Sequence, residues 1–438
     1  MPDLPGAPGV PEASHVGEGV LEAGGRAPAV APATGEVAGP RAMAMRAHLA
    51  VFVFAHLAHH LGTGAMAPVL PLVRDSFGLD YTRAGLLVSA QALALGAAQF
   101  PVSALGDHMS KPVLMAIGLL GVGAVGLAIA GSWSYWQLVA LLALTGVLAA
   151  SYHAPASAFL SSIFGGASRG RALGTHVIGG AVAFSATPLV ALEAARITGS
   201  WRTAFLVLAI PPIVAGVLLL ALYARRPSPR EVTSAAGGAE PVRLLASLGK
   251  FGPLVGVSLV EQLLTASLFA FIPLFMVDRH HIPPDRAGLV IALITGVGII
   301  AAPAGGALSD RFGRAPVLLL SSAVVGPLII LLANVPLGWP LVVVLVVYGI
   351  ASNTRMPVLE SLVADVVPAR RRATVLGLYY FVGQESAALA TPLVGQLFDT
   401  VGPASAFTLV GALGTAAALL LVLAWRPTMS QLRSRASG

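Results

Sequence analysis

The sequence of 438 residues contains no cysteine, and only 10% of its residues are charged. Without cysteine, the chain forms neither a disulfide framework nor a thiolate metal site. Soluble globular domains carry roughly 25% charged residues, so this chain has too few charges to cover a surface that faces water. The shortage of charge instead favours a protein whose surface faces lipid.

Hydrophobic residues make up 56% of the chain, and they are gathered in long runs. A bilayer core of ~30 Å requires about 20 apolar residues per helix, so each run predicts one helix that crosses the membrane. The runs are 47–72, 84–105, 112–130, 136–160, 172–194, 202–223, 252–276, 287–308, 315–333, 340–363, 374–397 and 403–425. The sequence therefore predicts an all-α membrane protein with twelve transmembrane helices.

Polar segments divide the chain into five parts. Residues 1–45 are rich in Pro, Gly and Ala and lack apolar periodicity, which predicts a disordered tail. A linker at 225–250 separates a first six-helix half, 46–224, from a second, 251–426, and a short basic tail follows at 427–438.

The Lys and Arg residues predict the topology. If both termini are cytoplasmic, the cytoplasmic segments hold 19 of the 26 basic residues, the opposite side holds 6, and Arg355 lies inside a helix. Orientation follows this bias. We therefore expect a multi-pass protein of the bacterial cytoplasmic (inner) membrane, with both termini and the linker in the cytoplasm. The same distribution explains the net charge of +7 without a nucleic-acid partner.

A short polar stretch occurs twice, at Gly306–Arg314 and, imperfectly, at Ser103–Lys111, 203 residues earlier. Trp136 and Trp339, each just before an apolar run, are separated by the same offset. A repeat of about half the chain indicates a two-fold duplication. The two six-helix halves are therefore expected to be pseudo-symmetric.

The second copy, Gly-Ala-Leu-Ser-Asp-Arg-Phe-Gly-Arg, resembles the loop motif Gly-x-Leu-Ala-Asp-Arg-x-Gly-Arg of the major facilitator superfamily. The resemblance covers about residues 46–425 and implies the major facilitator fold and secondary active transport by alternating access. Tyr152-His153-Ala154-Pro155 and the stretch from Arg169 to Gly180 also resemble the fosmidomycin-resistance-like branch, although Ala154 separates His from Pro.

The two aspartates of the repeated stretch are expected to gate the cytoplasmic side. A carboxylate at a membrane surface accepts hydrogen bonds from the free N–H groups at a helix start, where the macrodipole also favours negative charge. We expect Asp107 to contact the helix start near Thr374, and Asp310 to contact the one near Ala172. The gating residues are Asp107, Lys111, Asp310, Arg311, Arg314, Arg169 and Arg371.

Ionisable residues inside the apolar runs are costly, by at least ~2.5–3.5 kcal/mol for Asp, Lys or Arg at mid-helix, and mark functional sites. Arg355 is expected to hold an anionic substrate through paired hydrogen bonds. A carboxyl group in an apolar cavity takes up a proton more readily than one in water, so Glu261 and Glu385 are candidates for proton coupling. The alternative is that these glutamates only neutralise Arg355. The expected substrate contacts are Arg355, His153, Asn353, Gln384, Tyr152 and Gln91.

His56, His59 and His60 share one face of the first helix by their i, i+3, i+4 spacing. Imidazole suits proton relay near neutral pH, so His59 and His60 join the proton-coupling candidates. Two alternatives remain: hydrogen-bonded packing, and a metal ion held together with His153. Since no carboxylate is adjacent in sequence and no thiolate exists, the sequence assigns no metal site.

The function expected from these residues is proton-coupled efflux, by antiport, of a small drug or metabolite, with anions among the candidates. The alternatives are a proton-linked uptake symporter for a small organic anion, and a membrane scaffold or receptor without net transport. No enzyme motif, phosphate-binding loop or ATP-hydrolysing domain is found. The expected partners are therefore a small molecule, a proton or other ion gradient and the lipid bilayer. No cofactor is expected, and the protein is expected to be a monomer.

Overall fold

The computed structural model describes residues 40–164, 167–225, 252–367 and 369–436, and the regular structure in these residues is α-helical. Residues Met45–Gly438 form one compact unit, and residues 40–44, at the start of the first helix, are grouped with the N-terminal unit. The predicted linker and most of the predicted N-terminal tail lie outside the described residues.

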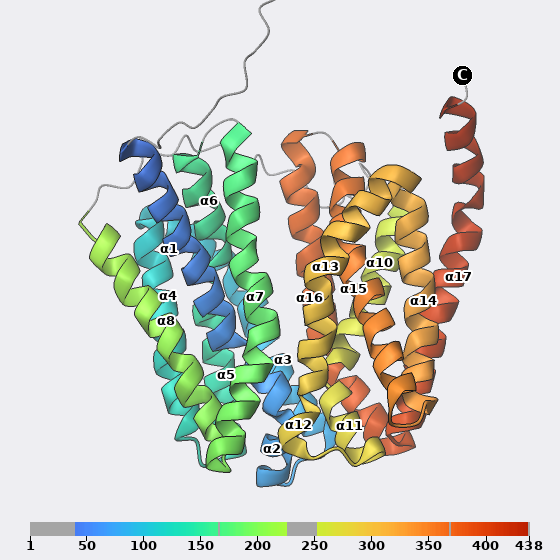
Figure 1. Cartoon of the computed structure of the whole chain (residues 1–438), viewed down its shortest axis with the longest axis horizontal. Helices are drawn as coiled ribbons and strands as arrows, with labels where there is room; N and C mark the ends of the chain where they lie inside the picture. Colours follow the sequence, from blue (N-terminus) through green and yellow to red (C-terminus); the bar gives the residue numbers. More distant parts are fainter. Residues whose placement is uncertain (1–39, 165–166, 226–251, 368, 437–438) are drawn as a thin grey trace, which may run out of the picture. The chain divides into compact units, whose positions relative to one another are not determined.

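The first half forms one bundle, coloured blue to green in Figure 1. Its helices are α1 (Pro40–Thr63), α2 (Met66–Phe77), α3 (Tyr81–His108), α4 (Lys111–Ala130), α5 (Tyr135–Ala149), α6 (His153–Ile163), α7 (Ala167–Thr198) and α8 (Arg202–Tyr223).

The second half forms another bundle, coloured yellow to red (Figure 1). Its helices are α10 (Gly252–Phe269), α11 (Ile272–His280), α12 (Pro284–Ala287), α13 (Leu289–Phe312), α14 (Arg314–Asn334), α15 (Trp339–Val366), α16 (Ala369–Val401) and α17 (Pro403–Ala436). Residues 40–45 and 427–436, assigned to tails by the sequence, thus belong to α1 and α17.

The twelve-helix prediction agrees with this architecture. Among the described residues, ten stretches are long and apolar enough to cross a membrane, and the bent pair α10–α11 supplies an eleventh. The remaining long helix, α16, has the place in the second half that α7 has in the first. Both copies of the repeated stretch, at the ends of α3 and α13, lie at the same end of the protein as the C-terminus (Figure 1).

Three of the predicted helices are broken, and a proline follows each break at the same spacing. A proline has no N–H to donate to the carbonyl four residues earlier, and its ring also clashes with that carbonyl. Pro68, Pro155 and Pro273 lie four residues after Gly64, Ser151 and Phe269, where α1, α5 and α10 end or have just ended. At the last break the axes of α10 and α11 differ by 57°.

Large apolar side chains on the outside of the bundles fit contact with lipid. Trp136 and Trp339 are 69% and 82% exposed and occupy matching positions at the starts of α5 and α15. Tryptophan is enriched where the lipid core meets the headgroups. The exposure of the repeated tryptophans therefore fits a position at the membrane boundary.

Small residues let the helices of each half approach closely. A Cβ atom added at Gly179 in α7 would lie 2.2 Å from the carbonyl oxygen of Val53 in α1. Gly179→Ala should therefore destabilise the protein by about 1–3 kcal/mol, the usual cost of overpacking, and lower its midpoint of thermal unfolding in detergent. Gly174→Ala is the matched control, because that glycine is in the same helix and no atom lies within 4 Å of the added carbon. Equal unfolding midpoints for the two variants would contradict this packing.

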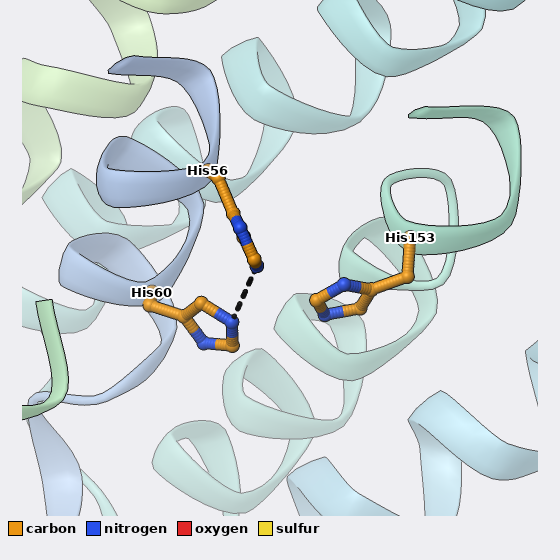
Figure 2. A group of neighbouring side chains, drawn as sticks. All are labelled: His56, His60 and His153. Carbon is orange, nitrogen blue, oxygen red and sulfur yellow. Dashed lines mark hydrogen bonds between the residues drawn. The ribbon is translucent and has the colours of Figure 1, made fainter. Parts of the chain in front are cut away.

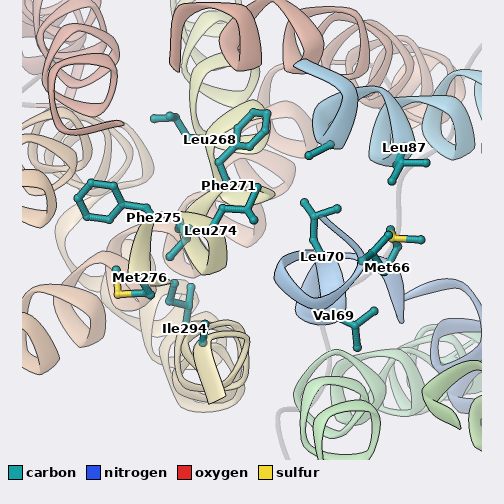
Figure 3. Packing of buried hydrophobic residues seen from close by; sticks show 14 of the residues in the cluster. Met66, Val69, Leu70, Leu87, Leu268, Phe271, Leu274, Phe275, Met276 and Ile294 are labelled. Carbon is teal, nitrogen blue, oxygen red and sulfur yellow. The ribbon is translucent and has the colours of Figure 1, made fainter. Parts of the chain in front are cut away.

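An apolar core joins the two halves near the end opposite the C-terminus. Leu70, Leu87 and Phe271 are fully buried members of one cluster that draws on both halves. Figure 3 shows side chains of α2 and α3 together with those of α10, α11 and α13. Separate clusters lie within the first half around Phe52 and within the second half around Leu359.

Candidate functional site

The candidate site lies where the two halves meet. Helix α3 packs against α16, and α7 packs against α13. The hydroxyl of Ser89 in α3 donates to the carbonyl of Ala388 in α16 at 2.7 Å, and the hydroxyl of Thr295 in α13 donates to the carbonyl of Phe184 in α7 at 3.1 Å. The two acceptor carbonyls lie at matching positions of the repeat, and the two donors lie in the matching helices α3 and α13.

Glu385 is placed in the α3–α16 contact. A Cβ atom at Gly96 of α3 would lie 1.6 Å from Oε1 of Glu385, so the carboxyl group occupies the space that a side chain there would need. The same oxygen is buried and has no hydrogen-bond partner among the described residues. A charged carboxylate held this way would lack full compensation for its lost hydration. The proton-coupling role of Glu385 stays a prediction, and the structure gives the position of its carboxyl group.

Arg355 lies in α15 and is buried, with 6% of its surface exposed. Its neighbours hold α15 against α13: the amide of Asn353 donates to the carbonyl of Ile294 at 3.1 Å, and the hydroxyl of Thr354 donates to that of Ala301 at 3.3 Å. The Asn353 amide, predicted to contact substrate, is thus engaged in helix packing in this conformation. Glu261 lies in α10, and its side chain is outside the described residues.

Five histidines of the first half form one cluster, with Tyr152 against it. The ring nitrogens Nε2 of His56 and His60 are 3.2 Å apart, and the rings of His59 and His153 are 4.8 Å apart, centroid to centroid. His176, which the sequence analysis did not single out, stacks on His56 at 4.3 Å. Figure 2 shows His56 and His60 from one helix facing His153 from another.

The break between α5 and α6 places His153 in this cluster. The chain passes through tight turns there, with hydrogen bonds from Ser151 to Leu148 and from Tyr152 to Ala149. Tyr152 is directed inward, and its hydroxyl donates to the carbonyl of Phe52 at 3.1 Å. His153 follows as the first residue of α6 and is exposed. Tyr152, predicted to contact substrate, therefore packs within the first half in this conformation.

Two other predicted substrate contacts differ in their surroundings. The amide of Gln91 donates to the carbonyl of Thr63 at 2.8 Å, at the point where α1 ends before the break. Gln91 thereby satisfies a carbonyl that a continuous helix would have used. Gln384, which precedes Glu385, is exposed.

The predicted gating residues surround the ends of α3 and α13. Asp310 accepts a hydrogen bond from Arg314 at 2.6 Å, and Arg314 also donates to Asp365 at 2.7 Å. Asp310 is exposed, and its partner Arg314 belongs to the same half. Among the described residues, Asp310 does not make the predicted contact near Ala172 in this conformation.

Some of the remaining predicted gating side chains are described by the structure, and others are not. Arg311 lies over the ring of Phe312 at 5.4 Å, and Arg169 donates to the carbonyl of Phe164 at 3.4 Å. Lys111 begins α4. The side chains of Asp107, Arg371 and Thr374 lie outside the described residues, so the predicted contact of Asp107 remains a prediction.

The opposite end carries a polar connection between the halves that the sequence analysis missed. The carboxylate of Asp399, near the end of α16, accepts from the N–H groups of Tyr81 and Thr82, both at 2.9 Å, and from the hydroxyl of Thr82 at 2.6 Å. These N–H groups begin α3 and have no partner inside the helix. A residue of the second half thus caps a helix of the first.

A second contact lies beside it. Arg74 of α2 donates to both oxygens of Asp278 in α11, at 2.6 and 2.8 Å, and the hydroxyl of Tyr81 also donates to Asp278. Paired hydrogen bonds of this kind are among the stronger polar contacts in proteins. We call Arg74, Tyr81, Thr82, Asp278 and Asp399 the interhalf latch.

Comparison with known proteins gives a family match over both halves. The family model described as "Major Facilitator Superfamily" matches residues 52–273 and 254–438. Similar solved structures include a bacterial homologue of the human lysosomal transporter Spinster in an inward-facing, unoccupied conformation, with a TM-score of 0.71 and 16% identity over 88% of this chain and 96% of that one. A peptide transporter POT in complex with alafosfalin gives a TM-score of 0.73 and 15% identity over 88% and 95%. At these identities the likeness shows the fold.

Similar curated proteins are named as transporters and resistance proteins. The chain is 25% identical to "MFS transporter asaE" of Aspergillus flavus, over 62% of this chain and 61% of the relative. It is 31% identical to "Tetracycline resistance protein, class B" of Escherichia coli, over 39% and 40%, and 26% identical to "Multidrug resistance protein MdtG" of Enterobacter lignolyticus, over 67% and 72%. The match thus spans less than two thirds of the length of the first two relatives.

Proposed function

Since this chain belongs to the Major Facilitator Superfamily, we propose that it is a proton-coupled secondary transporter that exports a small, anionic drug or metabolite by alternating access. Relatives named for tetracycline and multidrug resistance support efflux. The observation that carries the proposal is the position of Glu385, whose carboxyl group lies in the contact between the halves, against Gly96. The fosmidomycin-resistance-like branch remains a prediction from the sequence.

The coupling follows from the surroundings of this carboxyl group. A protonated Glu385 is neutral, so it fits the closed α3–α16 contact without an uncompensated charge. When the proton leaves, the buried carboxylate favours separation of α3 and α16, because water then reaches it. Proton binding and release thereby bias which side of the membrane is open, and this is what ion coupling requires.

Arg355 is the proposed anchor for the substrate. A guanidinium group holds a carboxylate or phosphonate through two parallel hydrogen bonds, and its burial in α15 strengthens such bonds. His153 and Gln384, both exposed, remain proposed contacts on the two halves. Glu261 remains a second candidate for proton coupling.

The test is a two-stage experiment on purified protein. A thermal-shift screen of anionic compounds and tetracycline, run at two pH values, selects a compound that binds. Proteoliposomes with a trapped pH dye then report proton movement driven by that compound. Glu385→Gln should reduce proton movement to background while the compound still binds. Arg355→Ala should weaken binding by about 10- to 100-fold, because hydrogen bonds to charged groups contribute about 1.5–3 kcal/mol.

Glu193→Gln is the matched control, because among the described residues Glu193 forms its ion pair with Arg196 of its own helix. This variant should retain wild-type coupling. Proton movement at the wild-type rate in Glu385→Gln would contradict the coupling role. The same liposomes also report the direction of proton movement relative to that of the compound. Protons that move against the compound indicate efflux by antiport, and protons that move with it indicate the alternative, uptake by symport.

A further inference from the structure

Three histidines of the cluster are arranged as ligands of one ion. His56, His60 and His153 each offer a ring nitrogen, and these atoms all lie within 4.8 Å of one another. Imidazole is a good ligand for Zn²⁺, Cu²⁺ and Ni²⁺, whereas Mg²⁺ and Ca²⁺ prefer oxygen. We propose that these three side chains bind one divalent transition-metal ion of the Zn²⁺ class. The proposal concerns binding and does not depend on the direction or the coupling of transport.

The spacing of the first two ligands fits a tetrahedral ion. His56 and His60 are one helical turn apart on α1, and their Nε2 atoms are separated by 3.2 Å. Two nitrogens bound to a tetrahedral Zn²⁺ at about 2.0–2.1 Å lie roughly 3.3 Å apart. An ion could therefore replace the hydrogen bond between these nitrogens with little movement of α1.

The hydrogen bonds behind His56 prepare it as a ligand. Its Nδ1 lies 2.9 Å from the carbonyl oxygen of His176 in α7, and a carbonyl only accepts, so Nδ1 carries the proton. Nε2 of His56 is then left with a free lone pair that points to His60. Metal-bound histidines in proteins usually donate their other N–H to a carbonyl or carboxylate in this way, which fixes the tautomer and the ring orientation.

The backbone of α7 is shaped to accept these rings. A Cβ atom at Gly180 would lie 2.8 Å from Cε1 of His56 and 3.1 Å from Cδ2 of His60, so glycine is needed for both imidazoles to pack against the helix. The ring of His56 also stacks on that of Tyr152, with ring centroids 5.6 Å apart. The first two ligands are thus held in place by α7 and α1 rather than by the ion alone.

The third ligand completes the site. His153 begins α6 directly after the chain break and is exposed, so its ring has room to turn, and Figure 2 shows it directed toward the other two. Three neutral imidazoles leave one tetrahedral position for water or an anion, as in catalytic zinc sites. The ring of Phe184, whose carbonyl contacts α13 of the second half, lies 4.4 Å from that of His60. The ion would therefore lie beside the contact between the halves.

The test uses the full-length protein in detergent after removal of any polyhistidine tag. Isothermal titration with ZnCl₂ should show one site per chain. Titration with CoCl₂ should give the intense visible absorption of tetrahedral rather than octahedral Co²⁺. His56→Ala and His153→Ala should each weaken Zn²⁺ binding by more than the roughly 10- to 100-fold that loss of a second-shell partner costs. His281→Asn, a change at an exposed histidine outside the cluster, should leave binding unchanged.

Gly180→Ala provides a variant that retains all three ligands. Gly180→Ala should weaken Zn²⁺ binding, because the added methyl group displaces His56 and His60. His153→Ala changes an exposed side chain, so this variant is expected to fold even if Gly180→Ala does not. Absence of a tetrahedral Co²⁺ spectrum in the wild type would overturn the proposal. Wild-type affinity and stoichiometry in His153→Ala would also overturn it, since the ion would then be held by other histidines.

Discussion

Replacing both Asp278 and Asp399 with asparagine should shift the protein toward the conformation that is open at the end of the interhalf latch. Asp399 accepts three hydrogen bonds from the start of α3, and Asp278 accepts from Arg74 and Tyr81. An asparagine keeps the shape but loses the charge, and its amide presents N–H groups to donors. Because Asp399 is exposed, its contribution is reduced by solvent. We expect a combined bias of roughly 2–3 kcal/mol, which is a roughly 30- to 150-fold change in the equilibrium.

The absence of cysteine makes this change measurable without background. Spin labels on pairs of introduced cysteines, one pair across each end of the two halves, report which end is open. In the double variant the pair across the latch should show a longer distance than in the wild type. Glu193→Gln, which removes an ion pair inside α7, should leave both distance distributions unchanged. An unchanged distribution in the double variant would mean that the apolar core alone closes this end.

The interhalf latch was not predicted from the sequence, which directed attention to Asp107 and Asp310 at the other end of the protein, and the reason is physical. Asp107 and Asp310 attract attention because they recur inside a repeated motif, whereas Asp278 and Asp399 lie outside that motif. The principle expected for Asp310, a carboxylate that caps a helix start, operates instead at Asp399. Arg74 was one signal for the interhalf latch, because it is one of only six basic residues that the predicted topology places on the side opposite the cytoplasm. Its partner depends on how the halves pack, which the sequence does not state.

The helix count, the two halves and the placement of the repeated stretches followed from hydrophobic runs and internal repetition. The positions of the helix breaks could not be predicted in this way. Pro71, Pro188 and Pro357 lie inside continuous helices, whereas Pro68 and Pro155 follow breaks. A proline weakens every helix that contains it, and the packing of the neighbouring helices decides whether the helix bends or ends. The position of His153, and with it the histidine cluster, depends on that decision.

The predicted site residues differ in how far the sequence indicates their surroundings. Burial of Arg355 and of the Glu385 carboxyl oxygen agrees with the rule that ionisable groups in spans face the protein interior. Asn353 and Gln91 were equally plausible as substrate contacts, since both are polar groups in apolar helices. In this conformation each donates instead to a backbone carbonyl. A sequence does not distinguish these two uses of an amide.

The second large effect is expected from a single added carbon at Gly288, between α12 and α13. A Cβ atom there would lie 2.3 Å from the carbonyl oxygen and 2.8 Å from the Cα atom of Pro68 in α2. Both are backbone atoms, so α2 and α12 must separate. The overpacking cost of about 1–3 kcal/mol is present only in the conformation in which α2 and α12 touch, and it is relieved when they separate. Gly288→Ala should therefore shift the population toward the conformation that is open at the latch end, by roughly 5- to 150-fold, and slow transport.

Gly296→Ala is the matched control, because this glycine lies two turns further along α13 and its added carbon would meet only Ser185, at 3.9 Å. It should retain the wild-type distances across both ends. Combining Gly288→Ala with Asp278→Asn separates the two causes, because residues that act on one contact are not additive. In Gly288→Ala the added methyl group separates α2 from α12, and this already weakens the ion pair of Arg74 and Asp278. Loss of that ion pair should therefore add little to the shift in the conformational equilibrium. Full additivity would show that the steric and the ionic contacts close the two halves independently.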